Sequence, residues 1–472
     1  MTSHPPAPSD RGLGHGFGRL FWAAVATNLG DGLSRVAVPL VAVTLTRDPL
    51  AVSVLGALAV LPWLLFGIHA GVLVDRHDRR RVMAIANGMR VVTVVAVLAS
   101  IVADSVNLVI LGAATVLFGV GEVLADNATN AIMPAVVRKD ALDRANGRIQ
   151  AAQIGVDTFV ATPLGGVLFA LAVTLPLLLA TGAFAAVVVL ALALPASAAR
   201  ARSRAVAPPL VVAPGESLPD GDVAEAVGPD RGEAATGEAE TPVRARDGIA
   251  FLWNYRWLRW MTLLTSATAA FLTFAQATTL LLFLDSFGVP EAAIGVVTAG
   301  VGLGGLAGAL GAPMVVARFG RGRVMLGGIL AAGAGLTAVG LAPNLPVAIG
   351  AYAISACGVG VWNVPWGATR QSVIPSELLG RVLGFGRTIG WGLIPIASIA
   401  GGLVARLSLT TPLIIGGLAI IALGLVGAVL ILATDRQPSV SDAEDEQVFD
   451  EEGRLADDAE APPREAVPAD VV

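Results

Sequence analysis

The sequence has 472 residues, of which 55% are hydrophobic and only 14% are charged, and its mean hydropathy is +0.74. This composition excludes an ordinary soluble globule and indicates an all-α protein that crosses a membrane many times. The formal net charge of −5 comes largely from acidic stretches within residues 216–240 and 442–458, so no nucleic-acid partner is implied. A single cysteine, Cys357, excludes an intramolecular disulfide and an all-cysteine metal site.

Composition divides the chain into five segments. Residues 1–18 are polar and lack an apolar core, so we expect a disordered cytoplasmic tail. Residues 19–195 and 248–434 hold the apolar stretches. Residues 196–247 and 435–472 are rich in acidic residues, and we expect them to form a disordered cytoplasmic linker and tail.

Twelve apolar stretches are each long enough to cross about 30 Å of hydrocarbon as a helix. An even count of spans places both termini on the same side of the bilayer. Before the seventh span, residues 248–260 interleave tryptophans with arginines, which suits a helix lying at the lipid headgroups. The predicted spans are residues 19–45, 51–74, 82–103, 107–133, 147–172, 175–195, 258–284, 291–316, 324–342, 346–369, 383–405 and 411–433.

Positive charge between the spans predicts their orientation. Links after even-numbered spans are rich in arginine, with four arginines between residues 76 and 81. Links after odd-numbered spans carry only Arg47 and Arg406. Because positively charged loops stay on the cytoplasmic side, the even links, the central linker and both termini are expected in the cytoplasm.

The link between spans 2 and 3 carries a recognisable motif, Gly-Val-Leu-Val-Asp-Arg-His-Asp-Arg-Arg-Arg over residues 71–81. It resembles the loop signature of the major facilitator superfamily, Gly-x-Leu-x-Asp-Arg-x-Gly-Arg-Arg/Lys. Asp78 replaces the usual glycine, as in a branch resembling the enterobactin exporter and macrolide efflux proteins, and is a candidate N-cap for the third helix. The residues in register, which the resemblance makes a gating loop, are Gly71, Leu73, Asp75, Arg76, Arg79 and Arg80.

The second half of the chain repeats features of the first. Residues 320–325 follow span 8 as residues 78–83 follow span 2, and the glycine pair 401–402 in span 11 matches the pair 165–166 in span 5. Such matches at nearly constant separation argue for two homologous six-helix halves. The second copy has Ala317 at the position of the signature aspartate.

The resemblance implies an all-α major facilitator fold of twelve transmembrane helices, arranged as two pseudo-symmetric six-helix bundles. It implies a monomer without a cofactor that rocks its halves around a central cavity faced by spans 1, 4, 7 and 10. It also implies that Asp75 closes the cytoplasmic side against residues 380–384, where the start of a helix favours an anion.

Carboxylates inside apolar spans are costly and are therefore candidates for proton coupling. Asp31 in span 1 either pairs with Arg35 one turn later or serves as a protonatable group. Glu122 and Asp126 share one face of span 4 and repel each other when both are ionised, so at least one is expected to hold a proton near neutral pH. Asp157 in span 5 is the fourth candidate.

Span 5 contains a further motif in Pro163, Gly165 and Gly166. These residues resemble the Gly-Pro-x-x-Gly pattern of drug and proton antiporters, although Thr162 stands at the first glycine position. The alternative interpretation is a proline kink with small residues for close helix packing.

Span 10 carries Trp362, Trp366 and Arg370 on one helical face. This face either holds an amphipathic substrate by stacking and cation–π contact or anchors the span in the bilayer through tryptophan. The other substrate-cavity candidates are Asn363, Gln276 and Arg35.

The sequence contains no ATP-binding Gly-x-x-x-x-Gly-Lys-Ser/Thr loop, no His-Glu-x-x-His and no Gly-x-Ser-x-Gly, so neither an enzyme nor a metal site is predicted. We expect a secondary transporter of the plasma or inner membrane that exports a small hydrophobic or amphipathic molecule, such as a drug, siderophore or secondary metabolite, with protons as the coupling ion. The alternatives are uptake or facilitated diffusion of a nutrient, and a receptor or scaffold that has lost turnover.

Overall fold

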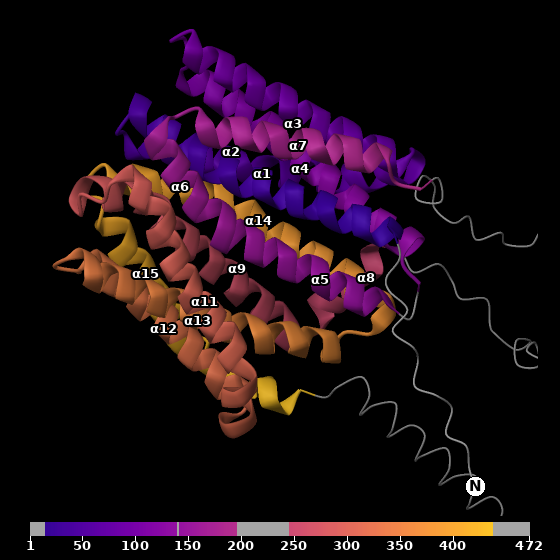
Figure 1. Ribbon diagram of the computed structural model, residues 1–472. Helices are drawn as coiled ribbons and strands as arrows, with labels where there is room; N and C mark the ends of the chain where they lie inside the picture. The colour runs from indigo at the N-terminus through magenta and orange to yellow at the C-terminus, as the bar shows by residue number, and fades with distance from the viewer. Residues whose placement is uncertain (1–14, 139–140, 196–244, 438–472) are drawn as a thin grey trace, which may run out of the picture.

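The computed structural model describes residues 15–138, 141–195 and 245–437, and the regular structure in these ranges is helical throughout. Figure 1 shows long helices lying side by side, with the first half of the chain in indigo to magenta and the second half in pink to yellow. α14, drawn in orange, lies among the helices of the first half and makes extensive contact with α2.

The first half contains six membrane-length stretches, of which the fifth is interrupted. A π-helical segment, η2 (Gly155–Ala161), separates its two α-helical parts, α5 (Leu142–Ile154) and α6 (Thr162–Leu171), where the sequence predicts one span. The other five helices are α1 (His15–Leu45), α2 (Pro49–Arg76), α3 (Arg79–Val102), α4 (Leu108–Val136) and α7 (Leu175–Leu192).

The second half begins with a short helix, α8 (Ala245–Asn254), which packs against α14 and α9. Its seventh and twelfth spans are both interrupted. The seventh span consists of α9 (Arg256–Gln276), α10 (Thr279–Leu281) and the π-helical η4 (Leu282–Ser286), and the twelfth of α15 (Thr411–Val426), α16 (Ala428–Leu432) and η5 (Ala433–Arg436). The uninterrupted helices are α11 (Glu291–Phe319), α12 (Arg321–Gly340), α13 (Leu345–Val373) and α14 (Ser376–Ala405).

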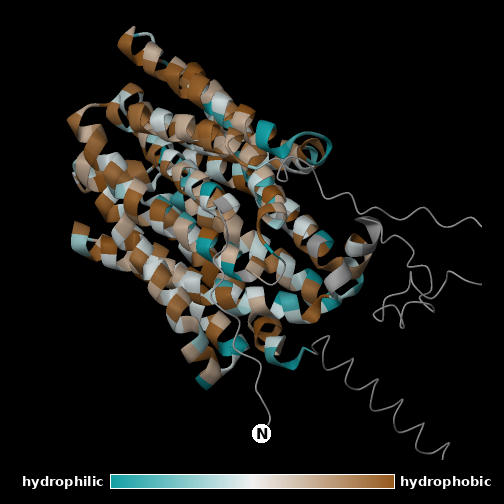
Figure 2. Cartoon of the chain, turned by 45° about the vertical axis from the view of Figure 1, so that its right-hand side comes forward, coloured by the Kyte–Doolittle hydropathy of each residue, from teal (hydrophilic) through white to brown (hydrophobic). Residues whose placement is uncertain are grey.

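Length and composition make these helices membrane spans. Within the described ranges ten stretches are long and apolar enough to cross a bilayer, and α15 with Ala428–Arg436, bent by 59°, makes an eleventh. α1 is not among these stretches, because it carries Arg19, Asp31 and Arg35, but its 31 residues are long enough to cross a bilayer, as the sequence predicts. Large apolar side chains point outward along the bundle, as lipid contact requires, and Figure 2 shows hydrophobic residues along the outer helices.

The N-termini of α3 and α12, which follow equivalent arginine-rich links, are capped differently. Asp78 accepts hydrogen bonds from the backbone N–H groups of Arg80 and Arg81, which confirms it as the N-cap of α3. Partial burial acts to raise the pKa of Asp78, but these bonds and the Arg80 side chain lower it overall. In α12 the residue at the equivalent position is Gly320, and Asp435 caps the helix from the other end of the half, 2.7 Å from the backbone nitrogen of Arg321.

Two names are used for the ends of the molecule. The arginine end holds the links 77–78, 137–138, 320 and 374–375. The sealed end holds the links 46–48, 172–174, 287–290 and 406–410. The two halves meet between the middle of the molecule and the sealed end, where α6 packs on α11 and α14 packs on α2. Trp63 and Trp391, with ring centroids 5.5 Å apart, form one of these contacts.

Pseudo-symmetric glycines let these helices approach closely. A Cβ on Gly166 would lie 3.0 Å from the backbone nitrogen of Gly295, and a Cβ on Gly402 would lie 2.5 Å from the Cβ of Ser53. Gly166 and Gly402 belong to the two glycine pairs that the sequence repeat matches. Each contact therefore joins one half to the other at an equivalent place.

Two ion pairs close the sealed end. Arg47 lies 2.6 Å from Asp285, and Arg406 lies 2.5 Å from Asp48. The hydrogen bond from Arg406 lowers the pKa of Asp48. The two arginines that the sequence places in the odd-numbered links thus each bridge the halves.

Glycine packing predicts opposite effects for two substitutions on α11. A Cβ on Gly308 would collide with the backbone carbonyl of Cys357 on α13, whereas a Cβ on Gly311 would meet nothing within 4 Å. Gly308→Ala should destabilise the protein by about 1–3 kcal/mol through overpacking. Gly311→Ala should leave the stability unchanged or raise it by up to about 1 kcal/mol, because alanine favours the helix. Thermal unfolding of the two purified variants tests this, and equal effects would contradict the packing described here.

Candidate functional site

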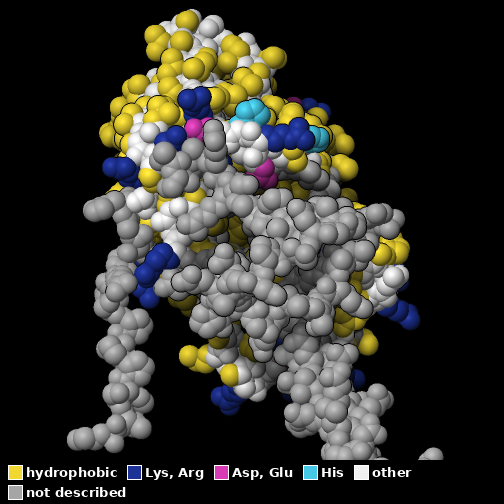
Figure 3. Space-filling view, turned by 90° about the vertical axis from the view of Figure 1, so that its right-hand side faces the viewer, with side chains coloured by type: hydrophobic (Ala, Val, Ile, Leu, Met, Phe, Trp, Pro, Cys, Tyr) yellow, Lys and Arg dark blue, Asp and Glu magenta, His cyan; other side chains and the backbone are white. Residues whose placement is uncertain are grey.

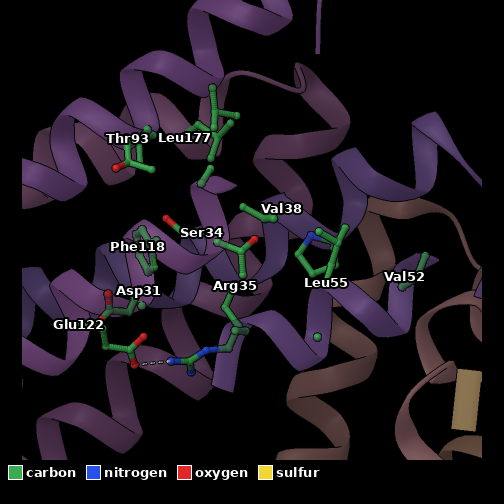
Figure 4. Close-up of a pocket in the computed structure, with 18 of the residues that line it drawn as sticks. Asp31, Ser34, Arg35, Val38, Val52, Leu55, Thr93, Phe118, Glu122 and Leu177 are labelled. Atoms are coloured by element: carbon green, nitrogen blue, oxygen red, sulfur yellow. Dashed lines mark ion pairs between the residues drawn. The ribbon is translucent and has the colours of Figure 1, made fainter. Parts of the chain in front are cut away.

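A cavity of about 330 Å³ lies inside the first half, between α1, α2, α3 and α4, and reaches the seventh span. This volume falls in the range of small-molecule binding sites. Its wall is mostly apolar and includes aliphatic side chains such as Val38, Leu55 and Leu177 (Figure 4). The polar and charged lining residues are Asp31, Ser34, Arg35, Thr93, Thr115, Glu122 and Gln276.

Arg35 joins two of the predicted carboxylates. Its guanidinium lies 2.5 Å from Asp157 Oδ2 and 3.8 Å from Glu122 Oε1, and Figure 4 shows the Arg35 side chain directed at Glu122. The Arg35 side chain is 59% exposed, so it is accessible within the cavity. It does not form the predicted pair with Asp31, because that carboxylate is directed at another helix.

The partner of Asp31 is Arg90, which sequence reasoning missed. Arg90 Nη2 lies 2.9 Å from Asp31 Oδ1, and the Arg90 side chain is fully buried. Its guanidinium lies between the rings of Phe118 and Phe184, 4.8 Å and 4.9 Å from their centroids. The signal was available, since an arginine inside the apolar third span is as costly as the carboxylates that the sequence did single out.

Glycines on α1 make room for this arrangement. A Cβ on Gly30 would lie 2.6 Å from the ring of Phe184, and a Cβ on Gly32 would lie 2.7 Å from Asp157 Oδ1. The residues on both sides of Asp31 must therefore be glycines, because a larger side chain would collide with the neighbouring helix. The Gly-Asp-Gly sequence is a packing requirement of the charged cluster.

The interrupted fifth span positions Asp157. The residue lies within the π-helical η2, and its carbonyl accepts a hydrogen bond of 2.8 Å from Thr162 Oγ1. π-Helical turns are uncommon and occur frequently at functional sites. After this segment, Pro163 and Gly165 lie in the first turn of α6, and Gly165 packs against Val36 of α1.

The charges of the cluster do not balance. Asp126 follows Glu122 by one turn of α4 and has no ion pair within 4 Å among the described residues. Four carboxylates thus face two guanidinium groups, and the fully ionised cluster would carry two uncompensated negative charges in an apolar surrounding. The sequence predicts the four carboxylates and Arg35, and the structure brings them together with Arg90.

The predicted residues of span 10 lie elsewhere. Trp362 and Trp366 are buried in the core of the second half, where Trp366 meets Trp257 edge to face, and this burial excludes bilayer anchoring. The guanidinium of Arg370 lies 5.1 Å from the centroid of the Trp366 ring. Asn363 is exposed. None of these four residues lines the cavity.

The signature link lies at the arginine end, on the face shown in Figure 3, where basic side chains are prominent. Asp75 is 69% exposed, and its ion pair within the described residues is with Arg79 at 3.3 Å. Arg79 also donates to the carbonyl of Ala131, and Arg80 donates to the carbonyl of Leu194. Arg76 beside them is exposed, and Gly71 lies one turn before Asp75 on α2.

Comparison with known proteins gives a consistent picture. The family model described as Major Facilitator Superfamily matches residues 20–397 and, again, residues 282–467. The multidrug efflux pump Tap of Mycolicibacterium fortuitum is 26% identical over 417 residues, which cover 84% of this chain and 93% of that protein.

Two solved structures share the fold. One is a bacterial homologue of the iron transporter ferroportin in an inward-facing state, with 15% identity, a TM-score of 0.65 and coverage of 89% of this chain and 100% of that chain. The other is a bacterial homologue of the human lysosomal transporter Spinster in an inward-facing and unoccupied conformation, with 15% identity, a TM-score of 0.61 and coverage of 91% and 98%.

The buried ion pair predicts a rescue experiment. Arg90→Gln leaves Asp31 buried without its counter-charge, which should destabilise the protein by about 3–5 kcal/mol. The double variant Asp31→Asn/Arg90→Gln removes both charges and should recover much of that loss. Thermal unfolding of the purified variants measures this, with Arg35→Gln as a control whose more exposed side chain should matter less. A double variant no more stable than Arg90→Gln alone would contradict the pairing.

Proposed function

The chain belongs to the major facilitator superfamily, and from that premise we propose that it exports a small amphipathic molecule across the plasma or inner membrane in exchange for protons. It does so as a monomer, by alternating the access of its cavity between the two sides of the bilayer. The observation that carries the proposal is the cavity itself, whose mostly apolar wall includes Asp31, Arg35 and Glu122. Ion pairs connect these residues to Asp157 and Arg90.

The contacts between the halves favour an inward-open state. Among the described residues, the glycine contacts and ion pairs that join the halves lie toward the sealed end, whereas Asp75 at the arginine end is largely exposed. By the distribution of arginine, the arginine end is the cytoplasmic one.

The cavity favours an amphipathic substrate. Aliphatic and aromatic groups such as Leu55 and Phe118 offer apolar contact, while Gln276 and the Arg35–Glu122 pair offer hydrogen bonds at specific points. Export is the favoured direction because Tap, a relative 26% identical over 84% of this chain, is named an efflux pump. Uptake would use the same geometry, and the direction of the driving gradient distinguishes the two.

Proton coupling follows from the charge imbalance. Arg35 is shared between Asp157 and Glu122, so a proton on either acid leaves the guanidinium paired with the other. Asp126 adds a further negative charge to the same region. Binding a proton therefore relieves repulsion in an apolar surrounding, and releasing it favours the binding of a cationic or hydrogen-bonding group.

Everted membrane vesicles test this coupling. With an acidic lumen, vesicles that contain the protein should accumulate members of a panel of lipophilic dyes, because protons leaving the lumen drive the dye inward. Glu122→Gln/Asp126→Asn should abolish this accumulation while leaving the protein in the membrane. Asp104→Asn, which changes an exposed link carboxylate outside the cluster, is the matched control. Gradient-driven accumulation that persists in the double variant would exclude these acids as the proton-coupling groups. If the protein instead lets dye cross the vesicle membrane down the dye's own concentration gradient, with no proton gradient present, it would be a facilitator.

The signature aspartate predicts a kinetic effect. In this structure Asp75 makes an exposed ion pair, so Asp75→Asn should change the stability by less than about 1 kcal/mol. In the proposed outward-open state the same carboxylate closes the cytoplasmic side, and its loss should slow transport by about two- to fivefold. Initial rates in the same vesicles, at equal protein abundance, measure this. An unchanged rate would contradict the gating role.

A further inference from the structure

A second hollow lies on the outer surface of the second half. It has a volume of about 500 Å³, is formed by α11, α12 and α13, and shares no lining residue with the central cavity. Phe319 and Ile354, which line it, are 50% and 57% exposed, so the hollow faces outward. We call it the α12 groove, and its lining includes Arg323, Gly327 and Cys357.

Regular helix spacing builds the groove. On α12, Arg323, Gly327 and Ala331 follow one another at intervals of four residues and share one face. From Arg323 to Ala331 this face extends about 12 Å along the helix axis. Gly327 leaves it open, because a Cβ there would meet nothing within 4 Å. The result is a long apolar channel with a single cation at its arginine end.

Within the described ranges, Arg323 has no acidic residues beside it like those in the equivalent link of the first half. There, Asp75 and Asp78 pair with the arginines of the link. In the second half, Ala317 and Gly320 stand at the equivalent positions. Among the described residues, Arg318, Arg321 and Arg323 have no carboxylate within 4 Å of their side chains. The nearby Asp435 uses both carboxylate oxygens on the backbone N–H groups of Arg321 and Gly322.

We propose that the α12 groove binds an anionic phospholipid, with one acyl chain along the apolar channel and the phosphate held by Arg323. The apolar walls exclude a hydrophilic ligand, and the outward face opens toward the hydrocarbon of the bilayer. Basic pockets between membrane helices bind anionic headgroups in this way. Arg323 lies in the first turn of α12, at the end of the span, where a phosphate sits at the membrane surface. In this proposal the lipid phosphate supplies the negative charge that Asp75 and Asp78 supply in the first half.

The sole cysteine of the chain provides a local reporter. Cys357 lines the groove and is partly exposed, so its alkylation by N-ethylmaleimide reports whether the groove is occupied. The full-length protein in detergent micelles is titrated with phosphatidylglycerol or with phosphatidylcholine carrying the same acyl chains. We expect phosphatidylglycerol to protect Cys357 at about fivefold lower concentration, since one arginine near a headgroup contributes that much to binding.

Three variants make the test specific. Arg323→Gln should abolish the difference between the two lipids. Arg81→Gln, at the equivalent position of the first half, should retain it. Gly327→Leu fills the channel and should remove protection by both lipids. A single symmetrical elution peak shows that each variant is folded.

Two results would overturn the proposal. Equal protection of the unmodified chain by both lipids would mean that the groove holds only general boundary lipid. A preference for phosphatidylglycerol that survives Arg323→Gln would place the anion site elsewhere. Native mass spectrometry of the same samples, counting retained lipids, provides an independent readout of the same difference.

Discussion

Neutralisation of two arginines inside the first half is the constraint on which the rest of the structure depends. Arg90 is fully buried and requires Asp31, which holds α1 against α3. Arg35 requires Glu122 and Asp157, which draws α4 and the π-helical segment toward the same face of α1. Without Asp31, the fully buried charge of Arg90 would cost several kcal/mol. The cavity exists because these helices are held by charge at points along their length and by apolar contact elsewhere.

Close backbone approach at a few glycines determines how the two halves meet. Gly166 and Gly402 occupy equivalent positions in the two halves, and each contacts the opposite half. Small residues suit a contact that forms and separates, because they bring backbones together without interlocking side chains. The contacts lie toward one end of the molecule, which leaves the other end free of them among the described residues. This asymmetry is what a rocking motion between two bundles requires.

Hydropathy and loop charge were enough to predict the helical fold and the spans, because a bilayer imposes length and apolarity on each span separately. The four carboxylates were predicted by the cost of a charge in lipid. Their pairing was not, since Asp31 and Arg35 are suitably spaced on one helix yet each pairs across helices. Partners on different spans depend on helix rotation, which one sequence does not give. The interruption at residues 155–161 was also beyond a periodicity argument, because a π-helical turn adds a residue without changing composition.

The link of residues 46–48 has a consequence for how the molecule can open. Arg47 and Asp48 are neighbours of opposite sign, and they bind two separate segments of the other half, through Asp285 in η4 and Arg406 after α14. The two ion pairs are independent, so one can break while the other still joins the halves. Because the two ion pairs share no atom, separation of this end does not require both of them to break at once.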